Sequence, residues 1–439
     1  MCMMFVFTFL YMSLKNFNSV IFVVGILLML CCNLLHMPGI KCKWQALAVL
    51  ALLLALCLMP HLPWISLRDF TEVEKCPACY GVSLCPAMNG GEITLSSFDI
   101  VTAIMNIIGS KNVMFGTFHD RKIVLKKLGH TTELNDVDKM ICALADLDYG
   151  CSVSEAILKQ GDLLQSVKRH VSQSLESQYD TASLASGLRL CPSVISLEIM
   201  LRNVFSLNRD ISINTLLANI WTTIMVNPEP LILQILPEED GWPVPKYLGA
   251  CGRLVAEEYA GEMLTYYHQA PWLQRVKLAY QLLVAALNFT DSHPQFSFYL
   301  TDISPDNIAV DAEGRLKFVD LENVIVVDRN TLDQDTLPSW NVPHESEIFD
   351  CDGCFIFSPD DICRHKKSDH NFFAVCQHLL HPLAASDIIP GGLLHDTPPS
   401  QTRVLELVEE CSKPVKLANR FTAAQELISE LEKVLHQQV

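Results

Sequence analysis

LTDISPDNIAVDAEGRLKFVDLE, from Leu300 to Glu322, is the most informative segment of the chain. A polar start is followed by the apolar triplet IAV, a DAEG turn and a second apolar run that ends at Asp320. Two short apolar runs joined by a turn predict a β-hairpin, which would return Asp320 to the side of Asn307. We therefore expect Asp302, Asn307 and Asp320 to lie at one site.

These three residues have the chemistry that phosphoryl transfer needs. That reaction uses a carboxylate near the acceptor hydroxyl, a polar metal ligand a few residues later and a second carboxylate on the metal. Protein kinases supply them with the motifs H-R-D-L-x-x-x-N and D-F-G. Here Asp302 and Asn307 are five residues apart, as in the first motif, and Asp320 follows thirteen residues after Asn307. A surface hairpin with ordinary acidic residues is the alternative, but the preceding amphipathic helix and the following hairpin favour the kinase interpretation.

Further upstream, Lys126 in IVLKK is expected to bind the nucleotide phosphates. The runs NVMFGTF and KIVLKKL, joined by HDR, predict a β-hairpin, and strand alternation turns Lys127 to the opposite face. A pair of surface lysines is the alternative. No G-x-G-x-x-G precedes this strand. The lysine's partner should be a glutamate on the following helix, where Glu133 is nearest, and the hinge-like AEEYAGEML places Glu258 and Tyr259 at the adenine.

Early strand patterns and late helical patterns predict an α+β, bilobal protein-kinase-like fold. LILQILP and YLGACGRLVAEEYAG predict strands, whereas PWLQRVKLAYQLLVAALNF predicts a helix beginning near Pro271. DHNFFAVCQHLL, from Asp369, resembles the helix that anchors a kinase catalytic loop, and a buried helix with a capping Asp is the alternative. The predicted parts are an N-terminal extension with a signal segment (1–66), a Cys-rich segment (67–95), an N-lobe with a helical insertion (96–254) and a C-lobe (255–439).

The amino terminus contains two apolar stretches, about residues 20–35 and 46–59. MPGIKCKW followed by QALAVLALLLALCL has the form of a basic and then an apolar region of a signal sequence, beginning at Met37. It would act as a cleaved signal peptide or as a type II signal anchor in the membrane. Either case places the following chain in the endoplasmic reticulum or Golgi lumen, or secretes it. A cytosolic protein with a buried apolar helix is the alternative.

Cysteine usage agrees with an oxidising compartment. Twelve of the 17 cysteines follow the apolar segments, an even number that full disulfide pairing requires. The clusters CPACYGVSLC and CDGCFIFSPDDIC have spacings that also suit zinc, but behind a signal sequence disulfides are favoured and no structural zinc is expected. Asn288, in the triplet NFT, is the predicted glycosylation site. The disulfide candidates are Cys76, Cys79, Cys85, Cys142, Cys151, Cys191, Cys251, Cys351, Cys354, Cys363, Cys376 and Cys411.

Net charge and one loop pattern exclude two other function classes. The formal charge of −17 argues against nucleic-acid binding, which usually needs a basic face. ADLDYGCSVSEA has two aspartates before a glycine, as calcium loops do. Its glycine comes one position early and its closing glutamate is missing, so we reject a calcium site there.

The order VLKKLG, NPEPLILQILPEEDGWPVPKYLGACGR, LTDISPDN, FVDLENV, DHNFFAVCQ and GGLLHD resembles the divergent protein kinase domain family. The resemblance extends from about Lys43 to the end, and the GWP-KYLGACGR block is its most specific part. It implies a signal-bearing, cysteine-rich protein of the endoplasmic reticulum, Golgi or extracellular space with a kinase-like fold. By that resemblance, Lys126, Asp302, Asn307 and Asp320 carry the kinase roles.

Two functions remain open at this stage. An active kinase would use ATP with Mg²⁺ or Mn²⁺ and transfer phosphate to a Ser/Thr-type or sugar hydroxyl, for instance on a protein substrate. A pseudokinase would act as a secreted or membrane-anchored ligand for a cell-surface receptor. Leu300 and Thr301 replace the usual His and Arg, Ser304 replaces a common lysine, and D-F-G becomes D-L-E, with Glu322 in place of the glycine. These departures favour the second function, and the four retained site residues favour the first.

Overall fold

The computed structural model describes residues 70–95, 112–176, 188–331, 337–347, 356–384, 390–414 and 419–437. They belong to one compact unit, Phe70–Val439. The predicted signal segment lies outside the described residues, as do Cys351 and Cys354. Within the described ranges, no helix has the length and apolar character that crossing a membrane requires.

The Lys126 strand lies in the middle of a five-stranded antiparallel sheet with the order β1-β2-β3-β6-β5. The predicted hairpin is confirmed, because β2 pairs with β3 and places Val113 opposite Lys126. His119 and Asp120 both have positive φ, at 49° and 62°, which suits the tight turn between paired strands. The strands of this sheet are β1 (Ile93–Leu95), β2 (Asn112–Phe118), β3 (Arg121–Lys127), β5 (Tyr247–Cys251) and β6 (Leu254–Glu258).

Apart from the short strand β4, the described chain between β3 and β5 is mainly helical, as predicted for most of this region. One prediction here is wrong: LILQILP is not a strand but forms most of helix α12, Glu229–Ile235. Pro228 precedes its first residue and buried apolar residues follow, a pattern that short helices and buried strands share. The other helices are α5 (Cys85–Gly90), before β1, and then α7 (Thr131–Leu144), α8 (Val153–Leu158), α9 (Leu163–Glu176), α10 (Leu197–Leu207) and α11 (Ile213–Val226).

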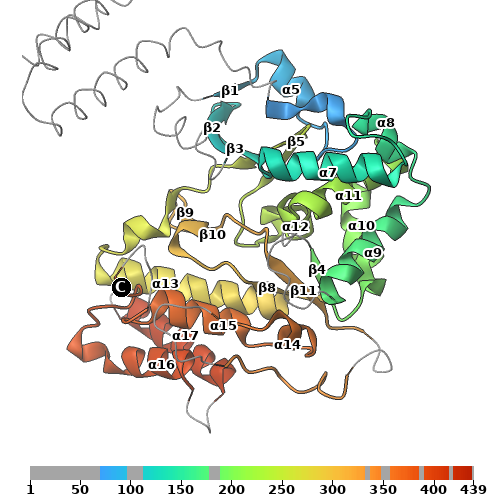
Figure 1. Cartoon of the computed structure of the whole chain (residues 1–439). Coiled ribbons are helices and arrows are strands. Elements are labelled where there is room, and N and C mark those ends of the chain that lie inside the picture. The colour runs from blue at the N-terminus through green and yellow to red at the C-terminus, as the bar shows by residue number, and fades with distance from the viewer. Residues whose placement is uncertain are drawn as a thin grey trace, which may run out of the picture. The chain divides into compact units, whose positions relative to one another are not determined.

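The segment from Leu300 to Glu322 begins at the end of β8 and supplies two strands, β9 and β10, of a second small sheet (Figure 1). Its predicted hairpin is confirmed, since β9 pairs antiparallel with β10. One sheet has the order β10-β9-β7 and the other β4-β11-β8. Helix α13 begins just after Pro271, as predicted. The elements are β4 (Arg189–Cys191), β7 (Glu262–Met263), α13 (Trp272–Leu287), β8 (Phe296–Leu300), β9 (Ile308–Val310), β10 (Leu316–Phe318) and β11 (Val324–Asp328).

The carboxyl-terminal part is helical, as its sequence predicted, and its helices gather beside α13 (Figure 1). They are α14 (Pro359–Cys363), α15 (His370–Ala374), α16 (Thr402–Ser412) and α17 (Arg420–His436). The predicted lobe boundary between residues 254 and 255 falls inside β6, which pairs with β3. The first sheet therefore continues to Glu258 before the chain leaves it.

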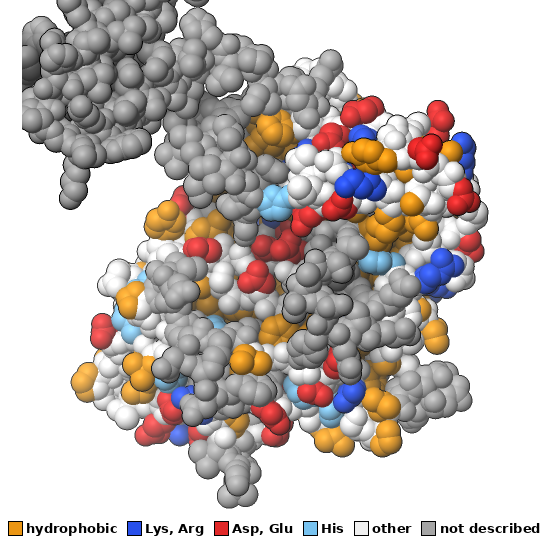
Figure 2. All heavy atoms as spheres, viewed as in Figure 1, with side chains coloured by type: hydrophobic (Ala, Val, Ile, Leu, Met, Phe, Trp, Pro, Cys, Tyr) orange, Lys and Arg blue, Asp and Glu red, His pale blue; other side chains and the backbone are white. Residues whose placement is uncertain are grey.

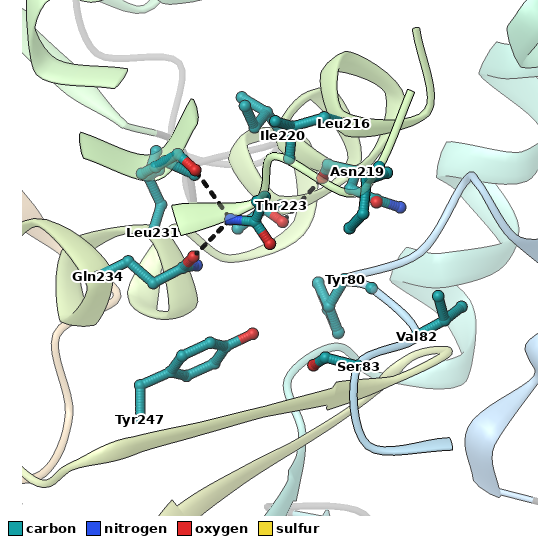
Figure 3. A pocket seen from close by; sticks show the side chains of 14 residues that line it. Tyr80, Val82, Ser83, Leu216, Asn219, Ile220, Thr223, Leu231, Gln234 and Tyr247 are labelled. Carbon is teal, nitrogen blue, oxygen red and sulfur yellow. Dashed lines mark hydrogen bonds between the residues drawn. The ribbon is translucent and has the colours of Figure 1, made fainter. Parts of the chain in front are cut away.

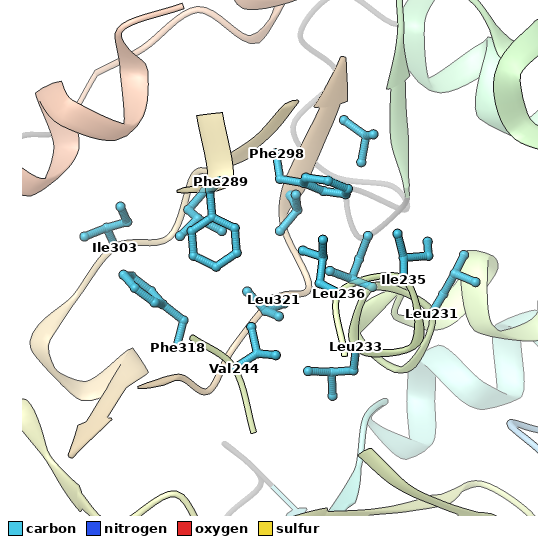
Figure 4. Close-up of a cluster of buried hydrophobic side chains, with 14 of the residues drawn as sticks. Leu231, Leu233, Ile235, Leu236, Val244, Phe289, Phe298, Ile303, Phe318 and Leu321 are labelled. Carbon is cyan, nitrogen blue, oxygen red and sulfur yellow. The ribbon is translucent and has the colours of Figure 1, made fainter. Parts of the chain in front are cut away.

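Helix α12 packs in a hydrophobic cluster that also contains residues of β8, of β10 and of the segment after β10. Figure 4 shows Leu233 and Leu236 near Leu321, with Phe318 on the far side of Leu321. Leu231 and Leu321 are both 1% exposed, so either large-to-small substitution would leave a cavity costing about 2–5 kcal/mol. This packing fixes the beginning of α12 relative to the segment that carries Asp320.

Within the part of the chain that the structure describes, five disulfides confirm the expected use of cysteine. They join ten of the twelve predicted cysteines. The pairs are Cys76–Cys79, Cys85–Cys251, Cys142–Cys151, Cys191–Cys363 and Cys376–Cys411.

Acidic side chains outnumber basic ones on the face seen in Figure 2, in line with the formal charge of −17. Asn288, the predicted glycosylation site, is half-buried in the turn that follows α13. Thr290 of the same triplet is fully buried and donates its hydroxyl to Ala286 O at 2.7 Å. The glycosylation of Asn288 remains a prediction.

Candidate functional site

Lys126 is the centre of a buried ionic cluster. Its Nζ lies 2.8 Å from Glu229 Oε1 and 2.9 Å from Glu257 Oε2. Both carboxylate side chains are 2% exposed, and the lysine side chain is 12% exposed. The ammonium also donates to Val319 O at 2.7 Å, directly before Asp320 in the chain. One lysine thus connects β3, α12, β6 and the segment that follows the β9–β10 hairpin.

Attraction between the opposite charges of this cluster partly offsets the cost of burying them. Burial disfavours the charged amine, but Glu229 and Glu257 together raise the pKa of Lys126 above its ordinary value. Burial also raises the pKa of Glu229, with further contributions from the negative charges of Glu257 and Asp320. The pKa of Glu257 is raised by burial and by Asp320. Asp320 therefore lies close enough to both glutamates to act on them.

Glu229, rather than the predicted Glu133, is the helix glutamate paired with Lys126. Glu133 lies in the first turn of α7, where its Oε2 accepts from the backbone N of His130 at 2.7 Å in a capping box. The structure thus gives Glu133 a local role at a helix end. The sequence prediction took the nearest helix after the strand, whereas the pairing helix begins about a hundred residues later.

The predicted metal ligands are brought together by the hairpin. The backbone N of Val319 donates to Asn307 O at 3.0 Å, which places Asn307 beside the residue before Asp320. Asn307 is 7% exposed and donates its Nδ2 to Asp302 O at 3.2 Å. Its Oδ1 oxygen is then the atom that could bind a cation together with the Asp320 carboxylate.

The two predicted ligands suit Mg²⁺ or Mn²⁺ better than a protein-enclosed metal. Among the described residues, no three His, Cys, Asp or Glu side chains converge in a way that would hold a metal ion. Mg²⁺ is commonly held by one or two protein oxygens, with substrate phosphates and water completing its shell. Asn307 and Asp320 therefore fit a metal that arrives with a nucleotide.

Asp302 is exposed, on the loop that follows β8. Helix α15 holds the beginning of this loop through hydrogen bonds to Leu300. The backbone N of Leu300 donates to Asn371 Oδ1 at 3.0 Å, and Leu300 O lies 2.8 Å from His370 Nε2. Asp369, predicted to lead this helix, accepts from the backbone N of Ser346 at 2.8 Å, and it makes no capping bond to its own helix. The two residues after it, not the aspartate, contact Leu300 at the end of β8, just before the loop of Asp302.

Glu322 stands where D-F-G has a flexible glycine, and its side chain has a hydrogen-bond partner. Its Oε2 accepts from Asn227 Nδ2 at 2.7 Å, and Asn227 Oδ1 accepts from the backbone N of Glu229 at 2.9 Å. Asn227 thus connects the segment after Asp320 to the first residue of α12. This contact would hold Glu229 and Asp320 in fixed relative positions.

The predicted adenine-binding residues lie at the end of β6. The backbone N of Glu258 donates to Lys246 O at 2.9 Å, and that of Tyr259 to Lys122 O at 3.2 Å. Those two N–H groups are engaged within the protein, so adenine would have to use other backbone groups of this connection. The Glu258 side chain pairs with Lys317 at 3.0 Å.

We expect acidification to loosen the support of the catalytic loop through His370. Burial lowers the pKa of His370 to about 4. The unfolded chain takes up its proton near pH 6.5, so the stabilisation is complete above that pH and is lost as pH falls toward 4, by about 3 kcal/mol. His378, whose pKa burial also lowers to about 4, adds a similar effect.

Between pH 7 and pH 4.5, His370 and His378 together lower the free energy of unfolding. His370→Gln should remove about half of this loss, as measured by urea titration. The exposed His436→Gln is the matched control and should leave the loss unchanged. An identical pH dependence in wild type and His370→Gln would contradict the prediction.

A family model described as the protein-kinase domain of FAM69 matches residues 220–414, which include Glu229, Asp302, Asn307 and Asp320. Divergent protein kinase domain 2A of Mus musculus is 35% identical over 92% of this chain and 93% of its own length. The chain belongs to the divergent protein kinase domain family. The Homo sapiens 2A protein is 36% identical over 90% of each chain, and Homo sapiens 2B is 27% identical over 71% and 73%.

Family membership confirms the resemblance inferred from the sequence, including the resemblance to its 2A member. The domain is kinase-like, and the structure brings Lys126, Asn307 and Asp320 to one region. Sequence reasoning missed Glu229, Glu257 and Asn227. Glu229 follows a proline at a helix beginning, a signal that could have identified it, whereas Glu257 is a charged residue in a buried strand whose partner no local pattern specifies.

Proposed function

We propose that this protein is a secretory-pathway kinase that transfers phosphate from ATP to a hydroxyl of a luminal or extracellular acceptor. The observation that carries the proposal is the contact of Lys126 with both Glu229 and the backbone next to Asp320. A lysine paired with a helix glutamate beside a metal-binding aspartate is what kinases need for the productive arrangement. The disulfides fit the oxidising lumen that a signal peptide or signal anchor would give access to.

In this proposal the first sheet and the helical carboxyl-terminal part act as the two lobes of a kinase. Lys126 would hold the nucleotide phosphates, and Asn307 and Asp320 would hold Mg²⁺ or Mn²⁺, which neutralises phosphate charge when bound. Asp302, exposed at the surface, would orient the acceptor hydroxyl and accept its proton while the acceptor oxygen bonds to the γ-phosphorus and ADP leaves. The acceptor would be a protein hydroxyl or a sugar.

One observation favours the second function, a pseudokinase that serves as a ligand for a cell-surface receptor. Lys126 already contacts two carboxylates, and Glu257 adds a negative charge where nucleotide phosphates would approach. A cation that compensates this charge is then required for ATP to bind. Nucleotide binding that depends on a divalent cation distinguishes the two functions.

We expect ATP with Mg²⁺ or Mn²⁺ to stabilise the full chain, secreted from an oxidising host. At ligand concentrations 100-fold above the dissociation constant the gain is about 2.7 kcal/mol, visible as a rise in Tm. Asp320→Ala should abolish the rise. Asp306→Ala, which changes an exposed carboxylate of the same loop, should keep it. No rise with either cation in a folded sample would contradict the kinase proposal and support the receptor-ligand function.

A further inference from the structure

The two cysteines of the segment Cys76-Pro77-Ala78-Cys79 differ in exposure, and the proposed function does not involve this segment. Its two cysteines form a disulfide across a sequence separation of 3. Cys79 is 0% exposed, whereas Cys76 is half-buried and reaches the surface. Cys79 is closed to solvent, so an incoming thiolate would have to attack the bond from the side of Cys76. Attack at Cys76 would make Cys79 the leaving group.

The environment of Cys79 suits a sulfur that gains negative charge. Asn219, on α11, lies with its Nδ2 3.5 Å from Cys79 Sγ. The same amide donates to Pro77 O at 2.9 Å and to Cys79 O at 3.1 Å, which holds the loop in place. A hydrogen bond to a charged sulfur is stronger than one to a neutral sulfur. Asn219, 6% exposed, would thus favour departure of Cys79 as a thiolate.

A cluster of paired charges with one excess cation borders the same loop. Arg253 is 1% exposed and donates its Nε to Ala78 O at 3.2 Å, inside the four-residue segment. Lys75 precedes Cys76 directly in the chain. Cationic surroundings lower the free energy of a thiolate relative to a thiol and raise the reactivity of a cysteine. The cluster consists of Lys75, Lys127, Arg253, Glu72 and Asp138, with three cations and two carboxylates.

The loop can open without opening the fold. A disulfide that closes a few residues constrains the unfolded chain far less than one that closes a long loop, such as Cys85–Cys251 with a separation of 166. Asn219 and Arg253 hold the backbone of the segment independently of the sulfur bond. The residues after Cys79 also border a cavity of about 50 Å³, lined by Tyr80, Asn219 and their neighbours (Figure 3).

We propose that Cys76–Cys79 is a thiol–disulfide exchange site whose substrate is a thiol. The substrate thiolate attacks Cys76 Sγ, a new S–S bond forms, and the Cys76–Cys79 bond breaks with Cys79 leaving as a thiolate that takes a proton from water. A second substrate thiolate then attacks the substrate sulfur of the mixed disulfide and releases Cys76. Two electrons pass from the substrate thiols, now a disulfide, to the protein dithiol. This reaction is independent of phosphate transfer.

Reduction of the wild-type full chain tests the proposal without any variant. The protein is equilibrated in glutathione buffers of increasing reducing strength, alkylated and analysed by peptide mapping. We expect Cys76–Cys79 to open while Cys85–Cys251 and Cys142–Cys151 stay oxidised and the circular dichroism spectrum stays native. Reduced, unfolded ribonuclease replaces glutathione in a second arm and distinguishes a protein dithiol from a small thiol as the substrate. Opening only together with the other disulfides, in both arms, would overturn the proposal.

Two matched variants test the direction of attack. Cys79→Ser leaves Cys76 as a free thiol, and Cys76→Ser leaves Cys79. We expect Cys79→Ser to form a mixed disulfide with oxidised glutathione at least about tenfold faster, because the accessible, cation-flanked cysteine reacts faster than the buried one. The doubly substituted protein, which has neither thiol, serves as the folding control. Equal rates for the two single variants would overturn the assignment of Cys76 as the attacked residue.

Discussion

Lys126→Met is expected to lower the free energy of unfolding by about 3–5 kcal/mol, because it leaves two buried carboxylates without their counter-charge. Glu229 and Glu257 both depend on this ammonium, at 2.8 and 2.9 Å. Met has a similar length, so the loss reflects charge more than volume. Chemical denaturation of the disulfide-intact protein at pH 7 measures it.

Lys127→Met is the matched control for this prediction. Lys127 is adjacent in the same strand, points to the other face, and pairs at 2.6 Å with Glu72, whose side chain is 24% exposed. Since water can reach Glu72, we expect a loss of only about 1 kcal/mol. Equal losses for the two variants would contradict the special role of the Lys126 cluster.

Removing the charges together should restore much of the stability. Lys126→Met combined with Glu229→Gln and Glu257→Gln contains no buried charge from the cluster, so the loss should be smaller than for Lys126→Met alone. The triple variant is expected to be folded but unable to respond to ATP with a divalent cation. A triple variant less stable than the single one would mean that packing, not charge, dominates at this position.

The site was predictable where its residues are close in sequence. Asp302, Asn307 and Asp320 lie within one loop and hairpin, so spacing and strand alternation were enough to place them together. Lys126 was also identified, because its strand has a recognisable apolar pattern and a turn before it. The residues that Lys126 contacts were not. Glu229 and Glu257 lie over a hundred residues further along, and only tertiary packing selects which glutamate reaches the lysine.

The prediction of the helices and strands was limited in the same way, because local sequence identifies long elements better than short ones. Long amphipathic segments such as α13 were identified because many periods of the pattern agree. The seven residues of α12 gave too few periods to separate a helix from a buried strand, and the apolar run favoured the strand. The cluster in Figure 4 explains why α12 is apolar on so many sides: Leu231, Leu233 and Ile235 are all buried. The lobe boundary predicted between residues 254 and 255 falls inside β6, whose pairing with β3 no local pattern specifies.

Arg420→Met is the second substitution expected to be severely destabilising, again by about 3–5 kcal/mol. Arg420 is 0% exposed and pairs with Asp369, which is 1% exposed. Its guanidinium also donates to Cys411 O at 2.7 Å and lies 4.8 Å from the centroid of the Phe373 ring. Removal of the arginine leaves the Asp369 carboxylate buried with a single backbone donor, the N of Ser346. Arg403→Met, which removes an exposed arginine with two surface partners, is the control and should have a much smaller effect.

The consequence of this substitution should extend to the catalytic loop. Asp369 immediately precedes His370 and Asn371, which hold Leu300 two residues before Asp302. If α15 shifts when its leading carboxylate loses its counter-charge, the Leu300 amide loses its acceptor and exchanges its hydrogen faster. Hydrogen exchange followed by mass spectrometry, under conditions where Arg420→Met is still folded, should show faster exchange at the beginning of the loop than in Arg403→Met. Unchanged exchange there would mean that the buried pair stabilises α17 without positioning Asp302.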